Sequence, residues 1–313
     1  MAVLALLVMP IVDCVQATAP QSDAGMACIS ATNAVAGDAS TPTLARTDAG
    51  QQHVQPVPQD AGLPSVHDDN DAGSLKDSTG CPGDLPGPKL VMVPAPTGGT
   101  YCIDGTEVAR GDYALFLSAQ SMAAGLVHQA AACQWNTSYV PATWKTQTDD
   151  KLPIVDVDWC DAAAYCTWAG KRLCGKIGGG ANDYTHYADP KQSQWYNACS
   201  AGGVKTYPYG DTYRGSTCNG YERAAGGVVA VGQMNACEGG YPGLFDMSGN
   251  VEEWEDSCTG ATGADDQCQF RGGSYNDGVA NARLNCDFAG NSTSWYGTRA
   301  SSDANLGFRC CRD

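Results

Sequence analysis

Cysteine is the residue type that most constrains how this chain can fold. The chain has 16 cysteines among 313 residues, and all except Cys14 and Cys28 lie from Cys81 onward. The later cysteines are even in number, and none is spaced as Cys-x-x-Cys, the spacing typical of zinc and haem sites. Disulfide bonds are therefore expected to hold the region after residue 80 together, in an oxidising compartment. Spacing alone leaves the pairing open.

The residues before Cys81 are expected to form no part of that region. Residues 1–14 contain an apolar run that is too short to span a bilayer and is similar to an export signal. Cys14 follows this run where a bacterial lipoprotein carries its lipid, so a lipid anchor and plain secretion are both open. Residues 15–80 are acidic, repeat Asp-Ala-Gly and lack aromatic residues, which predicts a flexible linker.

Residues 81–313 are expected to form one α+β domain with little regular structure. Strand-like patterns cover residues 90–94, 101–108 and 153–157, and helical spacing covers residues 112–123 and 159–169. From residue 174 to residue 250, glycine and aromatic residues dominate and no clear period remains, which predicts long ordered loops. Such loops are usually held by disulfides or metal ions.

The stretch from Gly243 to Trp254 is too rich in special residues to be a plain helix or strand. Gly243, Gly249 and Asn250 readily take backbone angles that other residues resist. Side-chain oxygens also recur there at short intervals, on Asp246, Ser248, Asn250 and Glu253. Two interpretations follow: a loop that binds calcium, which accepts about six to eight oxygen ligands, or a polar turn between two strands.

The same stretch resembles the Gly-Leu-Tyr-Asp-Met-x-Gly-Asn-Val-Trp-Glu-Trp signature of the formylglycine-generating enzyme family, also called sulfatase-modifying factors. Other blocks match the family in order, namely Tyr101–Val108, Leu152–Leu173, Phe270–Tyr275 and Asn305–Cys310. The resemblance covers roughly residues 88–312. It implies a loop-rich, disulfide-tied α+β fold that is related to C-type lectins.

The resemblance also implies a calcium site. Its ligands would be the side chains of Asp246 and Glu253 and the main-chain carbonyls of Gly249 and Val251. A second calcium site of the family begins at an Asn that matches Asn219, although the Asp that completes that site has no clear counterpart here. Calcium is therefore the expected cofactor.

Disulfide pairs can be expected on two grounds. The resemblance pairs Cys166 with the cysteine of the terminal Gly-Phe-Arg-Cys, Cys310, and suggests that Cys199 pairs with Cys286. Cys258 and Cys268 are close enough in the sequence to close a short loop.

The oxidase chemistry of the family is not expected in this chain. Active family members convert a sulfatase cysteine to formylglycine with O₂ and copper, and two cysteine thiolates that follow Gly-Gly-Ser-aromatic hold Cu(I). Here Asp277 and Ala282 occupy those two positions. Ser274 matches the active-site serine of the family and is the candidate catalytic residue, but serine alone cannot hold a soft ion. The signature also departs from the family at Glu252, where Trp is usual.

Two functions remain open at this stage. The first is an exported, calcium-stabilised binding or structural module, located in the periplasm, on the cell surface or outside the cell, with an unknown peptide, protein or glycan as its partner. The second is an oxidoreductase of the same family that acts on a protein cysteine or a small molecule with altered metal ligands. The net charge of −16 argues against nucleic acid as a partner, and no transmembrane span is expected.

Overall fold

The computed structural model describes residues 80–123, 125–290 and 297–313. The predicted export segment and linker, including Cys14, therefore lie outside the described residues, apart from Gly80. Within the described ranges, no helix has both the length and the apolar character needed to cross a membrane.

The described strands form two four-stranded sheets. The first is antiparallel, in the order β1 (Leu90–Pro94), β2 (Thr100–Asp104), β8 (Cys310–Arg312) and β3 (Arg172–Leu173). The second has the order β6 (Ala289–Gly290), β5 (Cys268–Arg271), β4 (Glu252–Cys258) and β7 (Leu306–Phe308), and its β4–β7 pair is parallel. A single residue, Arg309, separates β7 from β8, so its side chain lies where the chain passes from one sheet to the other.

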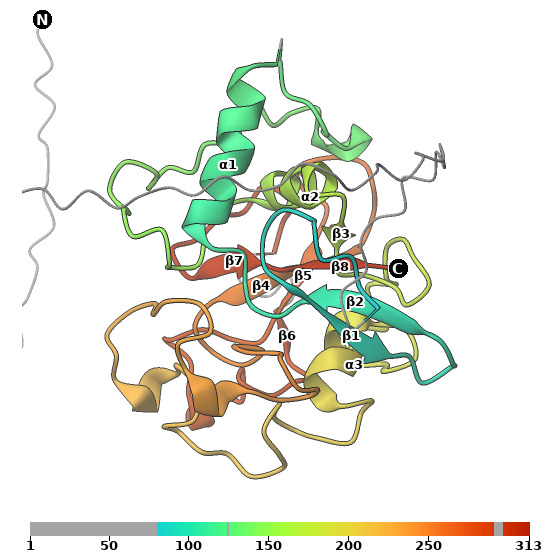
Figure 1. Cartoon of the computed structure of the whole chain (residues 1–313), viewed down its shortest axis with the longest axis vertical. Helices are drawn as coiled ribbons and strands as arrows, with labels where there is room; N and C mark the ends of the chain where they lie inside the picture. Colours follow the sequence, from blue (N-terminus) through green and yellow to red (C-terminus); the bar gives the residue numbers. More distant parts are fainter. Residues whose placement is uncertain (1–79, 124, 291–296) are drawn as a thin grey trace, which may run out of the picture. The chain divides into compact units, whose positions relative to one another are not determined.

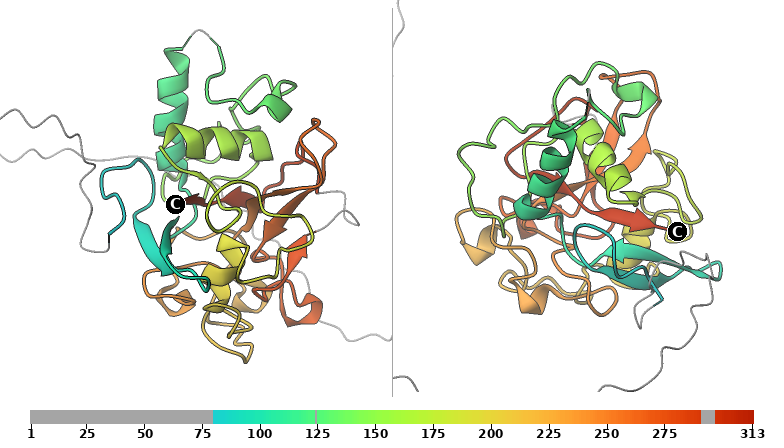
Figure 2. Two further views of the ribbon diagram at one scale, coloured as in Figure 1. Left: turned by 90° about the vertical axis from the view of Figure 1, so that its right-hand side faces the viewer. Right: turned by 45° about the horizontal axis from the view of Figure 1, so that its top comes forward.

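The helices lie on opposite sides of the strands. Figures 1 and 2 show α1 (Arg110–Ser121) and α2 (Trp159–Trp168) on one side, and α3 (Gln194–Ser200) on the other side with the loops that follow it. Short 3₁₀ turns interrupt the loops at Ala131–Cys133, Tyr221–Arg223, Asn235–Cys237 and Val279–Asn281. Asp158 caps the N-terminus of α2, and its side chain accepts a hydrogen bond from the main-chain N–H of Asp161.

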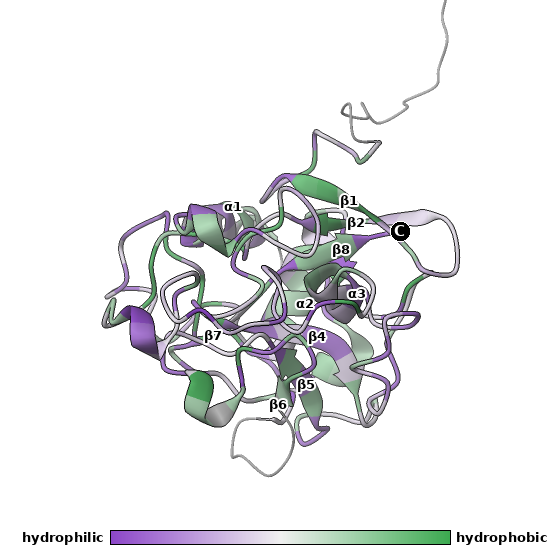
Figure 3. Cartoon of the chain, turned by 90° about the horizontal axis from the view of Figure 1, so that it is seen from below, coloured by the Kyte–Doolittle hydropathy of each residue, from purple (hydrophilic) through white to green (hydrophobic). Residues whose placement is uncertain are grey.

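Two hydrophobic clusters form the core. One packs α1 and α2 against the second sheet and contains Tyr113, Phe116, Tyr165, Trp254 and Phe308. The other packs α3 against the first sheet and includes Ile103, Trp195 and Met247. Strand β4 differs from its neighbours because most of its residues are hydrophilic, yet it occupies an inner position in its sheet (Figure 3).

Seven disulfides use every cysteine from Cys81 onward, so the prediction of a disulfide-tied domain is confirmed. The pairs include Cys166–Cys310, Cys199–Cys286 and Cys258–Cys268, the three anticipated from the sequence. The other four are Cys81–Cys102, Cys133–Cys160, Cys174–Cys311 and Cys218–Cys237.

Two strand predictions were wrong in their extent. Residues 153–157 form no strand and contribute only an isolated bridge between Pro153 and Ala109. Proline has no N–H to donate to a sheet, and Asp156 takes a left-handed φ of 58°, so the segment cannot continue as a ladder. Strand β2 ends at Asp104. The next residue, Gly105, still donates its N–H to the carbonyl of Lys89, but its own carbonyl accepts from the N–H of Phe245 in the loop before β4.

Candidate functional site

The loop from Gly243 to Val251 turns sharply at the positions that the sequence singled out. Gly243, Gly249 and Asn250 have φ of 88°, 77° and 63°, and Asp246 also has a positive φ, 57°. The Asp246, Ser248 and Asn250 side chains are buried, as is Glu253 in β4. The loop thus directs several polar groups into the protein interior, where each needs a partner.

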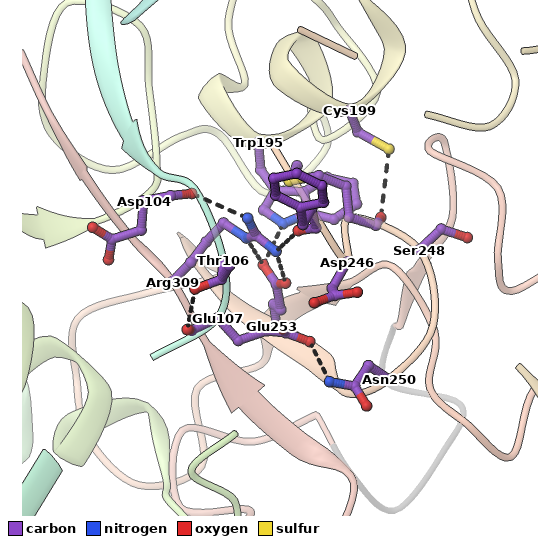
Figure 4. Close-up of polar contacts among 12 residues, drawn as sticks. Asp104, Thr106, Glu107, Trp195, Cys199, Asp246, Ser248, Asn250, Glu253 and Arg309 are labelled. Carbon is purple, nitrogen blue, oxygen red and sulfur yellow. Dashed lines mark hydrogen bonds and ion pairs between the residues drawn. The ribbon is translucent and has the colours of Figure 1, made fainter. Parts of the chain in front are cut away.

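Arg309 provides the partner for Glu253 (Figure 4). Its Nε and Nη2 donate to the two carboxylate oxygens of Glu253 at 2.6 Å each, and both side chains are almost completely buried. Arg309 also donates to the carbonyl oxygens of Asp104 and Phe245. The indole Nε1 of Trp195 donates to Glu253 at 2.8 Å. The carboxylate of Glu253 therefore accepts three hydrogen bonds from these two side chains.

Glu107 and Asp246 form a second pair of buried carboxyl groups beside this ion pair. One oxygen of Glu107 accepts from Asn250 Nδ2 at 3.0 Å, and one oxygen of Asp246 accepts from the Gly232 N–H at 2.6 Å. Glu107 Oε2 and Asp246 Oδ1 have no hydrogen-bond partner among the described residues. Burial, followed by the charges of Asp246 and Glu253, raises the pKa of Glu107 well above its ordinary value, and burial also raises the pKa of Asp246.

Asn219 is joined to this group through Asn250. Its Nδ2 donates to Asn250 Oδ1 and to the carbonyl oxygen of Gly227, each at 3.0 Å. The amide oxygen, Asn219 Oδ1, has no hydrogen-bond partner among the described residues. The loop of Asn219 is therefore fixed to the loop of Asp246.

The set Asp246, Gly249, Val251 and Glu253 does not fit calcium as it stands. Asp246 offers a free, buried carboxylate oxygen, which suits a hard cation. Glu253 does not, because its charge is neutralised by Arg309 and its oxygens already accept hydrogen bonds. Over the described ranges, no group of three or more His, Cys, Asp or Glu side chains is arranged around a metal position.

Ser274 and Asp277 form a closed turn at the end of β5. The main-chain N–H and the Oγ of Ser274 donate to Asp277 Oδ2 at 2.9 and 3.0 Å, and Asn305 Nδ2 donates to Ser274 Oγ at 2.9 Å. Both Ser274 and Asp277 are buried, whereas Ala282 is exposed and has a left-handed φ of 54°. The oxygen atoms of this turn are hard donors and suit no soft metal.

Comparison with known proteins identifies the family. The model of the sulfatase-modifying factor enzyme 1-like domain matches residues 96–313, which is more than half of the chain. The chain belongs to the sulfatase-modifying factor family. The resemblance inferred from its motifs is thereby confirmed.

Relatives in this family carry two kinds of name. Over 174 residues the chain is 33% identical to the mouse (Mus musculus) inactive C-alpha-formylglycine-generating enzyme 2, covering 51% of this chain and 49% of the relative. Over 221 residues it is 28% identical to the mouse formylglycine-generating enzyme, covering 60% and 54%. The chain thus spans about half the length of these relatives. Among solved structures, PvdO from Pseudomonas aeruginosa is similar with a TM-score of 0.48 and 18% identity, covering 72% of this chain and 94% of that one.

The sulfatase-modifying factor signature runs into β4, where acidic side chains form ion pairs that the sequence does not predict. Three acidic residues of β4 each meet an arginine: Glu252 with Arg283 at 3.4 Å, Glu253 with Arg309, and Glu255 with Arg271 at 3.5 Å. The acidic residues of β4 are evident in the sequence, but nothing local indicates which arginines they meet.

Glu252, which replaces the usual Trp of the family signature, should make stability depend on pH. Burial, followed by the charge of Asp277, raises the pKa of Glu252 from the ordinary 4.5 to about 8. Between these values the folded state holds a proton that the unfolded state has lost, so this group's contribution to stability falls as pH rises. We expect Glu252→Gln to flatten the fall in unfolding free energy between pH 5 and pH 8.5, measured by urea denaturation.

The matched control for this measurement is Glu238→Gln, because the Glu238 side chain is exposed. The control should retain the slope of the unmodified chain. An equal slope in the Glu252→Gln variant would show that Glu252 does not cause the pH dependence.

Proposed function

We propose that this chain is an exported member of the sulfatase-modifying factor family that lacks copper-dependent oxidase chemistry and acts as a binding or structural module. The observation that carries the proposal is the pair Asp277 and Ala282, which stand where the family resemblance places the two copper-binding thiolates. Carboxylate and methyl groups cannot replace thiolates as ligands for Cu(I). The name of the 33% identical mouse relative, an inactive enzyme, agrees with this assignment.

The disulfides support the same conclusion. All the cysteines of the described domain are paired with one another, so none of them offers a thiolate to copper near Ser274. Ser274 itself is held by Asp277 and Asn305. The site therefore keeps the serine of the family but not the groups that would make it an oxidase.

Export and partner binding complete the proposal. Proteins with this many disulfides are typically found in the periplasm, on the cell surface or in the extracellular medium. Lipidation at Cys14 would add a membrane anchor. The C-type-lectin relationship of the fold belongs to the proposal as well. A partner peptide, protein or glycan would contact the loop surface.

One pocket on that surface adjoins the Ser274–Asp277 turn. It has a volume of about 520 Å³, and its lining residues are Tyr221, Glu222, Ala224, Ala225, Gly226, Tyr275 and Asn276. The side chain of Tyr221 is 70% exposed, so its ring is available for stacking against a ligand. We place the partner contact at this pocket.

Copper binding tests the missing ligands directly. We expect the unmodified chain to withdraw no Cu(I) from a coloured competing chelator, whereas the double variant Asp277→Cys/Ala282→Cys should withdraw one equivalent. The matched control is Asp277→Ser/Ala282→Ser, which changes the same two positions but adds hydroxyl groups in place of thiols. It should behave like the unmodified chain. Stoichiometric Cu(I) binding by the unmodified chain, as tight as that of the double cysteine variant, would overturn the proposal.

A further inference from the structure

The surface pocket of about 520 Å³ has two walls that are fixed to each other. One wall contains the 3₁₀ turn Tyr221–Arg223, and the other belongs to residues 275–279. The main-chain N–H of Tyr221 donates to the carbonyl oxygen of Asp277 at 2.8 Å, and the N–H of Val279 donates to Glu222 Oε1 at 2.9 Å. The pocket is therefore formed before a ligand arrives, which lowers the entropic cost of binding.

The carboxylate of Glu222 is exposed and yet held in one position. Its Oε1 accepts from the N–H of Val279, and its Oε2 accepts from the hydroxyl group of Tyr213. Gly278 leaves the space for this carboxylate, because a Cβ at that position would clash with both of its oxygens. Although desolvation opposes the change, the two hydrogen bonds lower the pKa of Glu222, so the group is ionised at neutral pH. Each oxygen keeps a lone pair for a ligand.

Two tyrosines supply flat apolar surfaces to the same pocket. Tyr221 is 70% exposed, and Tyr275 is half-buried, with its main-chain N–H bonded to the carbonyl oxygen of Asn250. The exposed side chain of Asn276 adds an amide, which offers both donors and an acceptor. The pocket thus combines aromatic rings with two planar polar groups.

This combination favours a neutral carbohydrate among the partners open to a binding module. A sugar ring has an apolar C–H face that packs on an aromatic ring, and a rim of hydroxyl groups that donate to a carboxylate and pair with an amide. The ionised Glu222 and the net charge of −16 disfavour sulfated or uronic glycans. An extended peptide commonly adds to the edge of a sheet, and neither wall of this pocket belongs to a strand.

We propose that this pocket binds a neutral oligosaccharide, with the ring of Tyr221 stacked on one sugar and the carboxylate of Glu222 accepting hydrogen bonds from its hydroxyl groups. The inference rests on the binding module proposed above and names the class of its partner. Tyr221 supplies most of the exposed aromatic surface, so it should dominate the affinity, while Glu222 and Asn276 should select the arrangement of hydroxyl groups.

A glycan array that carries neutral and acidic oligosaccharides, probed with the labelled full chain, tests the class of ligand. We expect binding to neutral glycans only. Calorimetric titration with the neutral glycan that binds best then gives the Kd. Tyr221→Ala should weaken binding at least about 10-fold, whereas Tyr221→Phe keeps the ring and should remain within about threefold of the unmodified chain. The matched control is Met122→Ala, which truncates a side chain that is 82% exposed in another part of the domain.

Gly278→Ala tests the position of the carboxylate without removing it. The added Cβ displaces the flexible end of the Glu222 side chain, so the variant should stay folded, with an unchanged Tm. We expect it to bind the same glycan at least about fivefold more weakly, because the fixed acceptor is lost. Unchanged affinity in this variant would overturn the role of Glu222.

Three results would overturn the glycan site itself: binding to no neutral glycan, binding to acidic glycans only, or unchanged affinity in a folded Tyr221→Ala variant. Titration with a trilysine peptide provides the competing arm. Peptide binding that Tyr221→Ala abolishes, in the absence of glycan binding, would assign the pocket to a peptide instead. None of these results would affect the proposed loss of oxidase chemistry, which the Cu(I) measurement tests independently.

Discussion

Replacing all four cysteines of the Cys166–Cys310 and Cys174–Cys311 disulfides by alanine is expected to cost about 7–8 kcal/mol of unfolding free energy. These bridges span 144 and 137 residues. Both join β8, which contains Cys310 and Cys311, to the segment around β3, with Cys166 before β3 and Cys174 directly after it. The loss is similar in size to the whole stability of a typical domain, about 5–15 kcal/mol. We expect the four-cysteine variant to be largely unfolded.

Removing only one of these bridges should be much milder. With the other bridge present, the unfolded chain is already closed, and the second bridge closes only a short loop of roughly 10 residues, worth about 2–3 kcal/mol. Guanidinium denaturation of both single-pair variants and of the four-cysteine variant measures this coupling. The Cys258–Cys268 pair is the control, because it closes a separate short loop and its loss should add to that of either bridge. A single-pair variant as unstable as the four-cysteine variant would contradict the account.

Arg309→Met should remove about 3–5 kcal/mol, because it leaves the carboxylate of Glu253 buried without its counter-charge. Arg309 is 0% exposed, and it also donates to the Asp104 and Phe245 carbonyl oxygens, which link the first sheet to the loop before β4. Thermal and urea denaturation of the variant should both show the loss. The exposed Arg223→Met is the matched control and should change stability by no more than about 0.5 kcal/mol.

The double variant Glu253→Leu/Arg309→Met isolates the ion pair. The double variant removes the Glu253 carboxylate together with its counter-charge, so it should be more stable than Arg309→Met alone. The single variant Glu253→Leu completes the comparison. If the losses of unfolding free energy in Glu253→Leu and Arg309→Met simply add in the double variant, the interaction between Glu253 and Arg309 contributes little, and the stability of this region has another source.

The sequence predicted those parts of the fold that depend on local chemistry. The spacing of apolar residues located α2, and β1 has the predicted bounds. The glycines and Asn250 of the loop before β4 take the left-handed angles that their residue types favour. The even number of cysteines predicted disulfides, and the glycine-rich segment from residue 174 to residue 250 contains mainly loops.

The parts that could not be predicted depend on contacts between distant residues. Glu253 meets Arg309 across 56 residues, and Glu107 meets Asn250 across 143 residues. No periodicity records such contacts, so the sequence indicates neither the arginine that pairs with Glu253 nor the position of Glu107 beside this loop. The predicted strand at residues 153–157 was wrong for a related reason. The segment packs beside Val108, to whose carbonyl Ile154 donates its N–H, but Pro153 has no N–H to donate and Asp156 has a left-handed φ.

The measurement that tests the central claim most directly uses the full chain with Cu(I), O₂ and a sulfatase peptide that contains the target cysteine. Mass spectrometry then reports whether the cysteine becomes formylglycine. The account predicts an unchanged peptide, because Asp277 and Ala282 provide no thiolate for copper. Conversion of the cysteine to formylglycine would contradict the account and would establish the chain as an oxidoreductase with altered metal ligands.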